Sequence, residues 1–179
     1  SHGNSGFSAP FEINLVKKLC SFDIISPLRF DDGEWEKIIE NVPLALPLKE
    51  ELLIEILIND EFQEGLSPSF GTVPQAIARL LGNRKSEKAI SALFSTIGCG
   101  NFDLEEEVIH ALKKIGLAAK EVCMKKALLS SGRDFERALI ALQVFVPDEE
   151  VQKCAMKLLE KKQSIASYLK DYITCLLQK

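Results

Sequence analysis

The stretch Ala111-Leu112-Lys113-Lys114-Ile115-Gly116 ends an apolar helical pattern, and Ala141-Leu142-Gln143-Val144-Phe145-Val146 ends a similar pattern 30 residues later. A third version, Ala92-Leu93-Phe94-Ser95-Thr96-Ile97-Gly98, precedes both. Recurrence at a fixed period of this size is typical of stacked helical units that bury their apolar faces against one another. Such stacks present an extended surface to partners, so the sequence predicts a protein that binds something.

Around these phrases, apolar residues recur with helical spacing, and nothing alternates with a period of two over more than a few residues. We therefore predict an all-α fold without strands. The helices are expected to be antiparallel, about 9 to 10 in number and joined by short turns, as in an α-solenoid or bundle.

Composition divides the chain into three predicted segments. Residues 1–9 are rich in Gly and Ser and begin Ser1-His2, which is typical of a vector remnant or disordered lead. Residues 10–71 contain most of the prolines and are predicted to form a helical cap or degenerate repeats. Residues 72–179 are predicted to hold the regular repeats and a C-terminal capping helix.

Charge follows the same division. Residues 1–71 hold 5 Lys and Arg against 13 Asp and Glu, whereas residues 72–179 hold 17 against 13. The front is therefore acidic by 8 charges and the rear basic by 4. Such an asymmetry indicates docking between the halves, a basic surface for an acidic partner, or ordinary solvated faces that happen to differ.

Capping signals predict several helix ends. Ser86 is expected to cap a helix that reaches Ile97, and Asp103 to begin the following helix. Ser131 stands three residues before Asp134, the spacing of a capping box. Gly116 is expected to reverse the chain through a positive φ angle, because glycine adopts such angles at little cost.

The segment Leu104 to Gly116 resembles the second helix of a HEAT-type repeat, in particular the short variety found in many bacterial proteins, and Phe135 to Val146 resembles a looser copy. Small Ala111 and Ala141 would allow close helix approach, with a leucine after each in the shared core. The chain departs from the family pattern at Glu105, where Arg is common, and at Val146, which replaces a terminal glycine. The resemblance implies a right-handed α-α superhelix.

The predicted function is a non-enzymatic scaffold or adaptor for protein-protein interaction. Its partner is expected on the surface made by every second helix, near Arg79, Lys113 and Arg137. An acidic protein segment would suit the basic rear of the chain.

Two alternatives remain open at this stage. One is a regulatory or substrate-positioning domain of a larger enzyme, resembling the HEAT-like lyases that attach chromophores. The other, which we rank lower, is nucleic-acid binding through the basic rear. Its candidate residues are a ridge and a cluster of lysines: Lys153, Lys157 and Lys161, and Lys113, Lys114, Lys120, Lys125 and Lys126.

No motif predicts catalysis, a cofactor or a metal site. The chain has two histidines, and His110 stands four residues after Glu106, which predicts an ordinary surface pair on a helix. Gly98-Cys99-Gly100 is predicted to be a plain connection between helices, and glycines nowhere form a phosphate-binding loop. The sequence therefore predicts no enzyme activity.

Cysteines and hydropathy bear on location. The five cysteines are at least 21 residues apart and form no CxxC, so neither zinc nor a disulfide framework is indicated. Cys20, Cys123, Cys154 and Cys175 fall in apolar helical stretches and are expected to be buried. No apolar run is long enough to span a membrane and no secretory signal is present, which favours a reducing, cytoplasmic location.

Overall fold

The computed structural model describes residues 50–58, 72–161 and 164–179, and these residues are all-α, as predicted. Eight α-helices and two short 3-10 helices occupy them, with no strand in the described ranges. The predicted lead over residues 1–9 and most of the predicted cap lie outside the described residues. The elements are α3 (Glu50–Ile58), α5 (Thr72–Asn83), η4 (Glu87–Ala89), α6 (Ile90–Thr96), α7 (Phe102–Ile115), α8 (Leu117–Leu129), α9 (Gly132–Leu142), η5 (Gln143–Phe145), α10 (Glu149–Lys161) and α11 (Ser167–Cys175).

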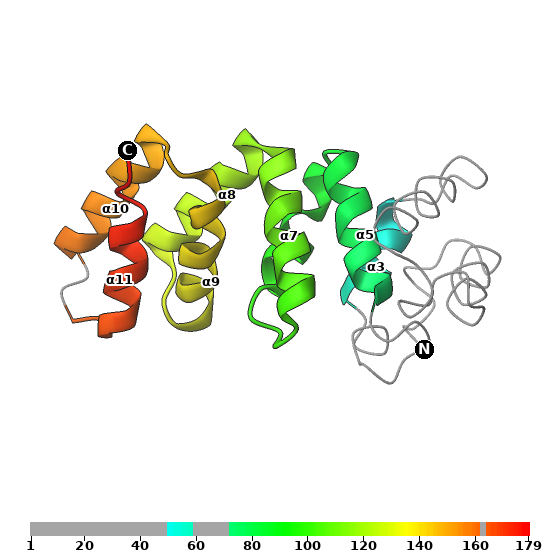
Figure 1. Ribbon diagram of the computed structural model, residues 1–179, viewed down its shortest axis with the longest axis horizontal. Coiled ribbons are helices and arrows are strands. Elements are labelled where there is room, and N and C mark those ends of the chain that lie inside the picture. Colours follow the sequence, from blue (N-terminus) through cyan, green and yellow to red (C-terminus); the bar gives the residue numbers. More distant parts are fainter. Residues whose placement is uncertain (1–49, 59–71, 162–163) are drawn as a thin grey trace.

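Alternate helices of the chain lie in two layers (Figure 1). One layer contains α5, α7, α9 and α11, and the other contains α6, α8 and α10. Successive helices pack across the layers, for example α8 against α9 and α10 against α11. The elements consequently follow one another along the long axis of the molecule in chain order, and each contacts mainly its neighbours.

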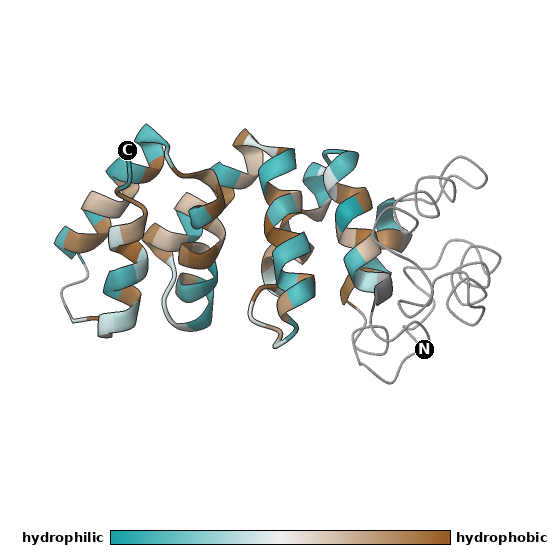
Figure 2. Ribbon diagram, viewed as in Figure 1, coloured by the Kyte–Doolittle hydropathy of each residue, from teal (hydrophilic) through white to brown (hydrophobic). Residues whose placement is uncertain are grey.

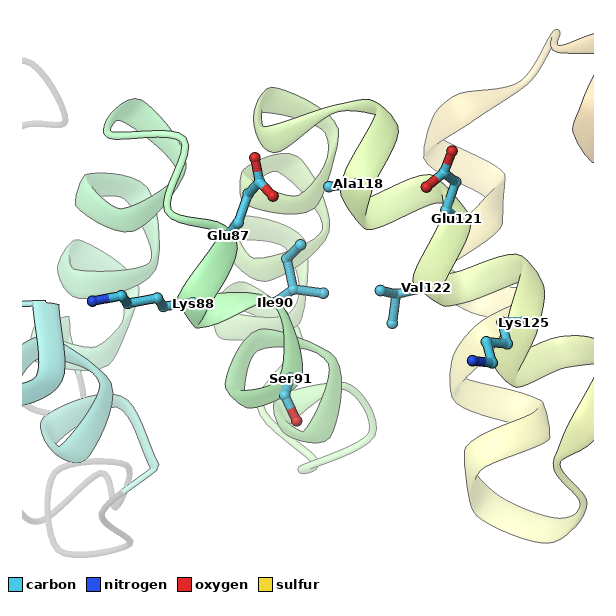
Figure 3. A pocket seen from close by; sticks show the side chains of 8 residues that line it. All are labelled: Glu87, Lys88, Ile90, Ser91, Ala118, Glu121, Val122 and Lys125. Atoms are coloured by element: carbon cyan, nitrogen blue, oxygen red, sulfur yellow. The ribbon is translucent and has the colours of Figure 1, made fainter.

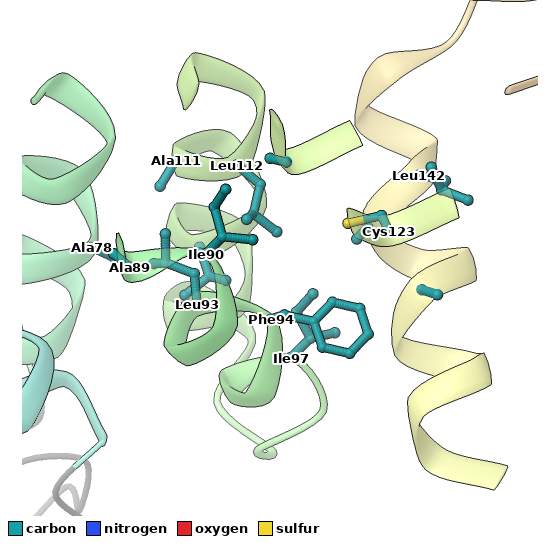
Figure 4. Close-up of a cluster of buried hydrophobic side chains, with 14 of the residues drawn as sticks. Ala78, Ala89, Ile90, Leu93, Phe94, Ile97, Ala111, Leu112, Cys123 and Leu142 are labelled. Atoms are coloured by element: carbon teal, nitrogen blue, oxygen red, sulfur yellow. The ribbon is translucent and has the colours of Figure 1, made fainter. Parts of the chain in front are cut away.

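A single apolar core runs between the layers. Helices α5, α7, α9 and α10 have a hydrophilic and a hydrophobic side (Figure 2), because their apolar residues recur every three or four positions. Leu112 and Leu142, the leucines of the repeated phrase, are fully buried, as are Ala111 and Ala141 beside them. Figure 4 shows how side chains from α5 to α9 converge in this core.

Helix α3 extends the same core into the acidic front of the chain. Its Leu53 and Leu57 are fully buried in the common cluster, and the helix packs against α5 and α6. The buried Ser86 hydroxyl donates a hydrogen bond of 2.9 Å to Glu50 Oε2 at the start of α3. Packing is therefore continuous on both sides of residue 71, where the composition changes.

Helices α5 and α7 approach one another closely at Gly82. A Cβ atom added to Gly82 would lie 2.7 Å from Ala111 Cα and 2.9 Å from Ala111 Cβ. Real Cβ atoms do not approach backbone atoms so closely, so only glycine fits at this position. Ala111, the small residue of the repeated phrase, thus allows two helices to approach closely, as the sequence predicts. Gly82 is the residue of α5 that it contacts.

Several predicted helix starts are wrong in detail. Helix α7 is capped by Asn101, whose Oδ1 accepts a 3.0 Å hydrogen bond from Leu104 N–H, so Asp103 lies inside the first turn. Ser86 makes no side-chain cap, because its hydroxyl binds Glu50, and the chain passes through η4 before α6 begins. Ser131 precedes α9 without a side-chain cap. Local spacing identified these helices but not the groups that satisfy their ends.

The two departures from the repeat pattern have structural explanations. Glu105 Oε2 accepts a 2.9 Å hydrogen bond from Gly98 N–H, which closes the connection between α6 and α7. Gly116 has φ +88°, as predicted for a reversing residue. Val146 has an ordinary φ of −74°, because η5 turns the chain before it and no positive φ is needed.

We expect Gly82→Ala to lower the free energy of unfolding by about 1–3 kcal/mol, because α5 and α7 must separate to admit the methyl group. The loss should exceed the gain that alanine brings to a helix interior. Urea denaturation followed by circular dichroism measures it. The control is Lys153→Ala on the exposed face of α10, for which we expect a change within about 0.5 kcal/mol; an equal effect of both variants would contradict the close approach.

Candidate protein-binding surface

The three residues predicted to lie nearest a partner stand on α5, α7 and α9, which belong to one layer. Arg79 on α5 forms a bidentate pair with Glu107 on α7, with Nη2 to Oε1 at 2.7 Å and Nε to Oε2 at 3.1 Å. Both side chains are about three-quarters buried. Arg79 therefore holds α5 against α7 beside the Gly82 contact.

Arg137 also makes contacts within the protein. Its Nε donates a 2.8 Å hydrogen bond to the carbonyl of Ile97, and its Nη1 lies 3.0 Å from Asp134 Oδ1. Ile97 ends α6 and Arg137 belongs to α9, so the guanidinium ties the two layers together. Lys113 is exposed, and no hydrogen bond or ion pair joins it to another described residue.

The lysine cluster predicted from the sequence is divided by the fold. Lys120 is 9 % exposed, and its Nζ lies 2.8 Å from Asp148 Oδ2 and 2.9 Å from Glu150 Oε1. Lys126 lies over the Phe94 ring and 3.9 Å from Asp134. These lysines link helices, which weakens the case for a continuous basic surface around α8.

The Lys120 contacts join α8 to the start of α10 and shift two pKa values. Hydrogen bonds to both carboxylates hold the pKa of Lys120 above its ordinary 10.5. Burial acts to raise the pKa of Asp148, but hydrogen bonds from Lys120 and from Val151 N–H outweigh it and hold that pKa below 3.8. Asp148 thus caps α10 and binds Lys120 with the same carboxylate.

A shallow groove lies in the other layer, between η4 and α6 on one side and α8 on the other (Figure 3). It has a volume of about 510 Å³. Ile90 and Val122 point toward one another across its middle, and charged side chains stand along its edges. Its lining residues are Glu87, Lys88, Ile90, Ser91, Ala118, Glu121, Val122 and Lys125.

The sequence does not indicate this groove and instead predicts a partner on the opposite layer, near Arg79, Lys113 and Arg137. The available signal was the spacing of Ala118, Val122 and Lys125 on α8, where apolar residues continue onto a charged face. This spacing alone cannot locate a groove, because the groove also depends on which helix packs beside α8. The fold brings η4 and α6 there from about 30 residues earlier in the chain.

The histidine and cysteine side chains of the described residues form no reactive site. His110 and Glu106 form the predicted exposed pair at 3.9 Å. Burial raises the pKa of Cys123 to about 12, and the Cys154 thiol is buried as well. Cys175 is exposed, contrary to prediction, and Cys20 lies outside the described residues. Within the described ranges, no group of His, Cys, Asp or Glu side chains is arranged to hold a metal ion.

Comparison with known proteins finds a similarity in the front of the chain. A family model described as Type I Thoeris inhibitor Tad3 matches residues 1–44, about a quarter of the chain and outside the described residues. No curated protein matches, and no solved structure does. Among the helices that the structure describes, none has the length and apolarity needed to cross a membrane.

We expect Arg79→Ala and Arg137→Ala each to lower the free energy of unfolding by about 1–3 kcal/mol, because each removes charge-assisted hydrogen bonds between helices. Arg79→Lys should recover little, since an ammonium group cannot form the bidentate pair. Lys113→Ala, on the exposed face of α7, is the control and should change stability by less than about 0.5 kcal/mol. Thermal and urea unfolding measure all four variants.

We expect Lys120→Met to lower the free energy of unfolding at pH 7 by about 1–3 kcal/mol, because two carboxylates lose their partner. The lowered pKa of Asp148 contributes stability above its ordinary pKa of 3.8, and this contribution is lost as the pH falls through the folded-state value. The variant should therefore lose less stability than the wild type between pH 5 and pH 3. Lys125→Met, on the same helix, is the control and should keep the wild-type pH dependence in urea titrations at each pH.

Proposed function

We propose that this protein is a non-enzymatic protein-binding module that acts by occupying its partner. The observation that carries the proposal is the match of residues 1–44 to a model of an inhibitor family. An inhibitor acts by binding its target, which agrees with the scaffold or adaptor role predicted from the repeats. The match suggests that the partner is a component of a type I Thoeris system.

The described helices supply a surface suited to this role. The groove beside α8 is open and shallow, with an apolar middle and charged edges, which is the usual composition of a protein interface. Its lining holds no histidine or cysteine. Cys123 and Cys154, the buried thiols among the described residues, lie in the core, where burial suppresses the thiolate form. The arrangement favours recognition over reaction.

We further propose that the two-layered stack is a short HEAT-like solenoid. The equivalent burial of Ala111 with Ala141 and of Leu112 with Leu142 supports this assignment. A repeat stack offers a rigid surface while its packing remains local. The four described cysteines are free thiols, which is consistent with the cytoplasmic location expected from the sequence.

The proposal is tested by titrating the full chain against each purified protein of a type I Thoeris system. We expect a saturable complex with one component, with a dissociation constant of about 1 μM or below, measured by biolayer interferometry. Inhibition of the system should be complete only when the concentration of this protein is at least equal to that of the bound component. An enzyme would instead inhibit at a small fraction of that concentration.

A matched pair of variants tests the contribution of the family-matched segment. Asp31→Lys with Asp32→Lys changes the charge within residues 1–44, and Glu61→Lys with Glu64→Lys makes the same change outside it. Only the first double variant should weaken the complex. If no component binds the wild type at about 100 μM chain, or if inhibition is catalytic, the proposed function is wrong.

A further inference from the structure

We propose that the groove between α6 and α8 binds a short helical segment of the partner, in which an apolar side chain lies between a basic and an acidic residue. This inference rests on the proposed function and specifies the chemistry of the partner. It differs from the acidic segment that the net charge of the rear suggests. The groove has its own charge distribution, and that distribution decides what fits.

The apolar middle of the groove gives the segment its anchor. Ile90 on α6 and Val122 on α8 face one another, with Ala118 one turn before Val122 (Figure 3). Ile90 is only 6 % exposed, so it forms the floor, whereas Val122 and Ala118 are partly exposed at the wall. A branched aliphatic side chain that enters the groove would pack against these three apolar side chains. Its removal from water would favour binding.

The edges of the groove are charged differently at its two ends. The carboxylates of Glu87 and Glu121 stand at one end, on opposite walls. Lys125 stands at the other end, across from the Ser91 hydroxyl. Lys88 points away toward α3, where its Nζ lies 3.4 Å from Glu51. The groove is thus negative at one end and positive at the other.

These charges are available to a partner. Among the described residues, no ion pair or hydrogen bond joins Glu87, Glu121 or Lys125 to another side chain. Lys120, directly before Glu121, is by contrast fully engaged inside the protein. A basic side chain placed between Glu87 and Glu121 would meet two carboxylates, and an acidic side chain beside Lys125 would meet one ammonium group.

The spacing of the charges fits a helix. Glu121 and Lys125 are one turn apart on α8, which corresponds to about 6 Å along the axis. A segment with a basic residue, an apolar residue and an acidic residue on successive turns presents all three on one face, with its two charged residues about 11 Å apart along the axis. The Glu121 and Lys125 side chains point away from one another toward the two ends of the groove (Figure 3), so their charged groups lie farther apart than one turn of backbone. A wholly acidic segment would place carboxylates beside Glu87 and Glu121, and repulsion would disfavour it.

Four 15-residue fluorescent peptides on an Ala and Gln background test the inference. They carry, at three successive turns, Arg-Leu-Glu, Glu-Leu-Glu, Arg-Leu-Arg or Arg-Ala-Glu. We expect the first to bind the full chain with a dissociation constant of about 100 μM, since one small groove supports only a weak contact. The other three should bind at least about fivefold more weakly by fluorescence anisotropy, through lost charge pairs or the lost anchor.

Variants of the protein identify the site. Glu87→Lys with Glu121→Lys makes the whole groove basic, so the preference should switch to the Glu-Leu-Glu peptide, a change in the ratio of affinities of about tenfold or more. Glu106→Lys with Asp171→Lys makes the same change in net charge on exposed residues of the other layer and should leave the preference as in the wild type. Val122→Asp should weaken every leucine-containing peptide about tenfold. Circular dichroism and urea midpoints verify that each variant is folded.

The inference would be overturned by equal binding of all four peptides, by a switch of preference in the control variant, or by self-association of the chain that Val122→Asp abolishes in sedimentation velocity. The last would make a second copy of the chain the occupant. The proposed function fails separately, when the wild type binds no Thoeris component. A partner complex that Val122→Asp leaves unchanged would preserve that function and reject this groove.

Discussion

The backbone contact between α5 and α7 at Gly82 and Ala111 is the constraint on which the rest of the stack depends. It sets the separation of two helices in one layer, and this separation lets the Arg79 guanidinium reach both oxygens of Glu107. It also brings Lys114 Nζ within 2.8 Å of Asn83 Oδ1 at the C-terminal ends of the two helices. A larger residue at either position would shift all of these contacts together, because close-packed helices move as units.

The helical fold and its core could be predicted from the sequence because period and residue size act locally. Ala111, Leu112, Ala141 and Leu142 are buried as their spacing predicts. The partners of polar groups could not be predicted in this way, because they lie far away along the chain. Ser86 binds a carboxylate of α3 rather than the helix it precedes, and Lys120 meets acids about 30 residues later. A count of charges along the sequence assumes that such residues are exposed. The packing of the helices determines which of them are exposed and which are buried.

The candidate binding surface likewise combines features that local sequence predicts with features that depend on contacts between distant residues. Arg79, Lys113 and Arg137 lie on α5, α7 and α9, and the fold gives Arg79 and Arg137 contacts within the protein. The groove beside α8 depends on which helices become neighbours and on where Glu87, Glu121 and Lys125 point, and neither can be derived from spacing alone. A helical stack thus separates two uses of charge: one set of ion pairs joins successive units, and another remains available for recognition.

The reactivity of the buried thiols depends on whether the helices around them separate. Cys123 on α8 and Cys154 on α10 each lie about one turn after the residues of their helix that form the Lys120 contact, and Cys154 Sγ lies 4.0 Å from the carbonyl of Met124. Burial raises both pKa values, so neither sulfur reacts readily while the helices remain packed. Thiol modification at these positions would therefore measure how often the last helices detach, and exposed Cys99 supplies a rate for a sulfur that needs no opening.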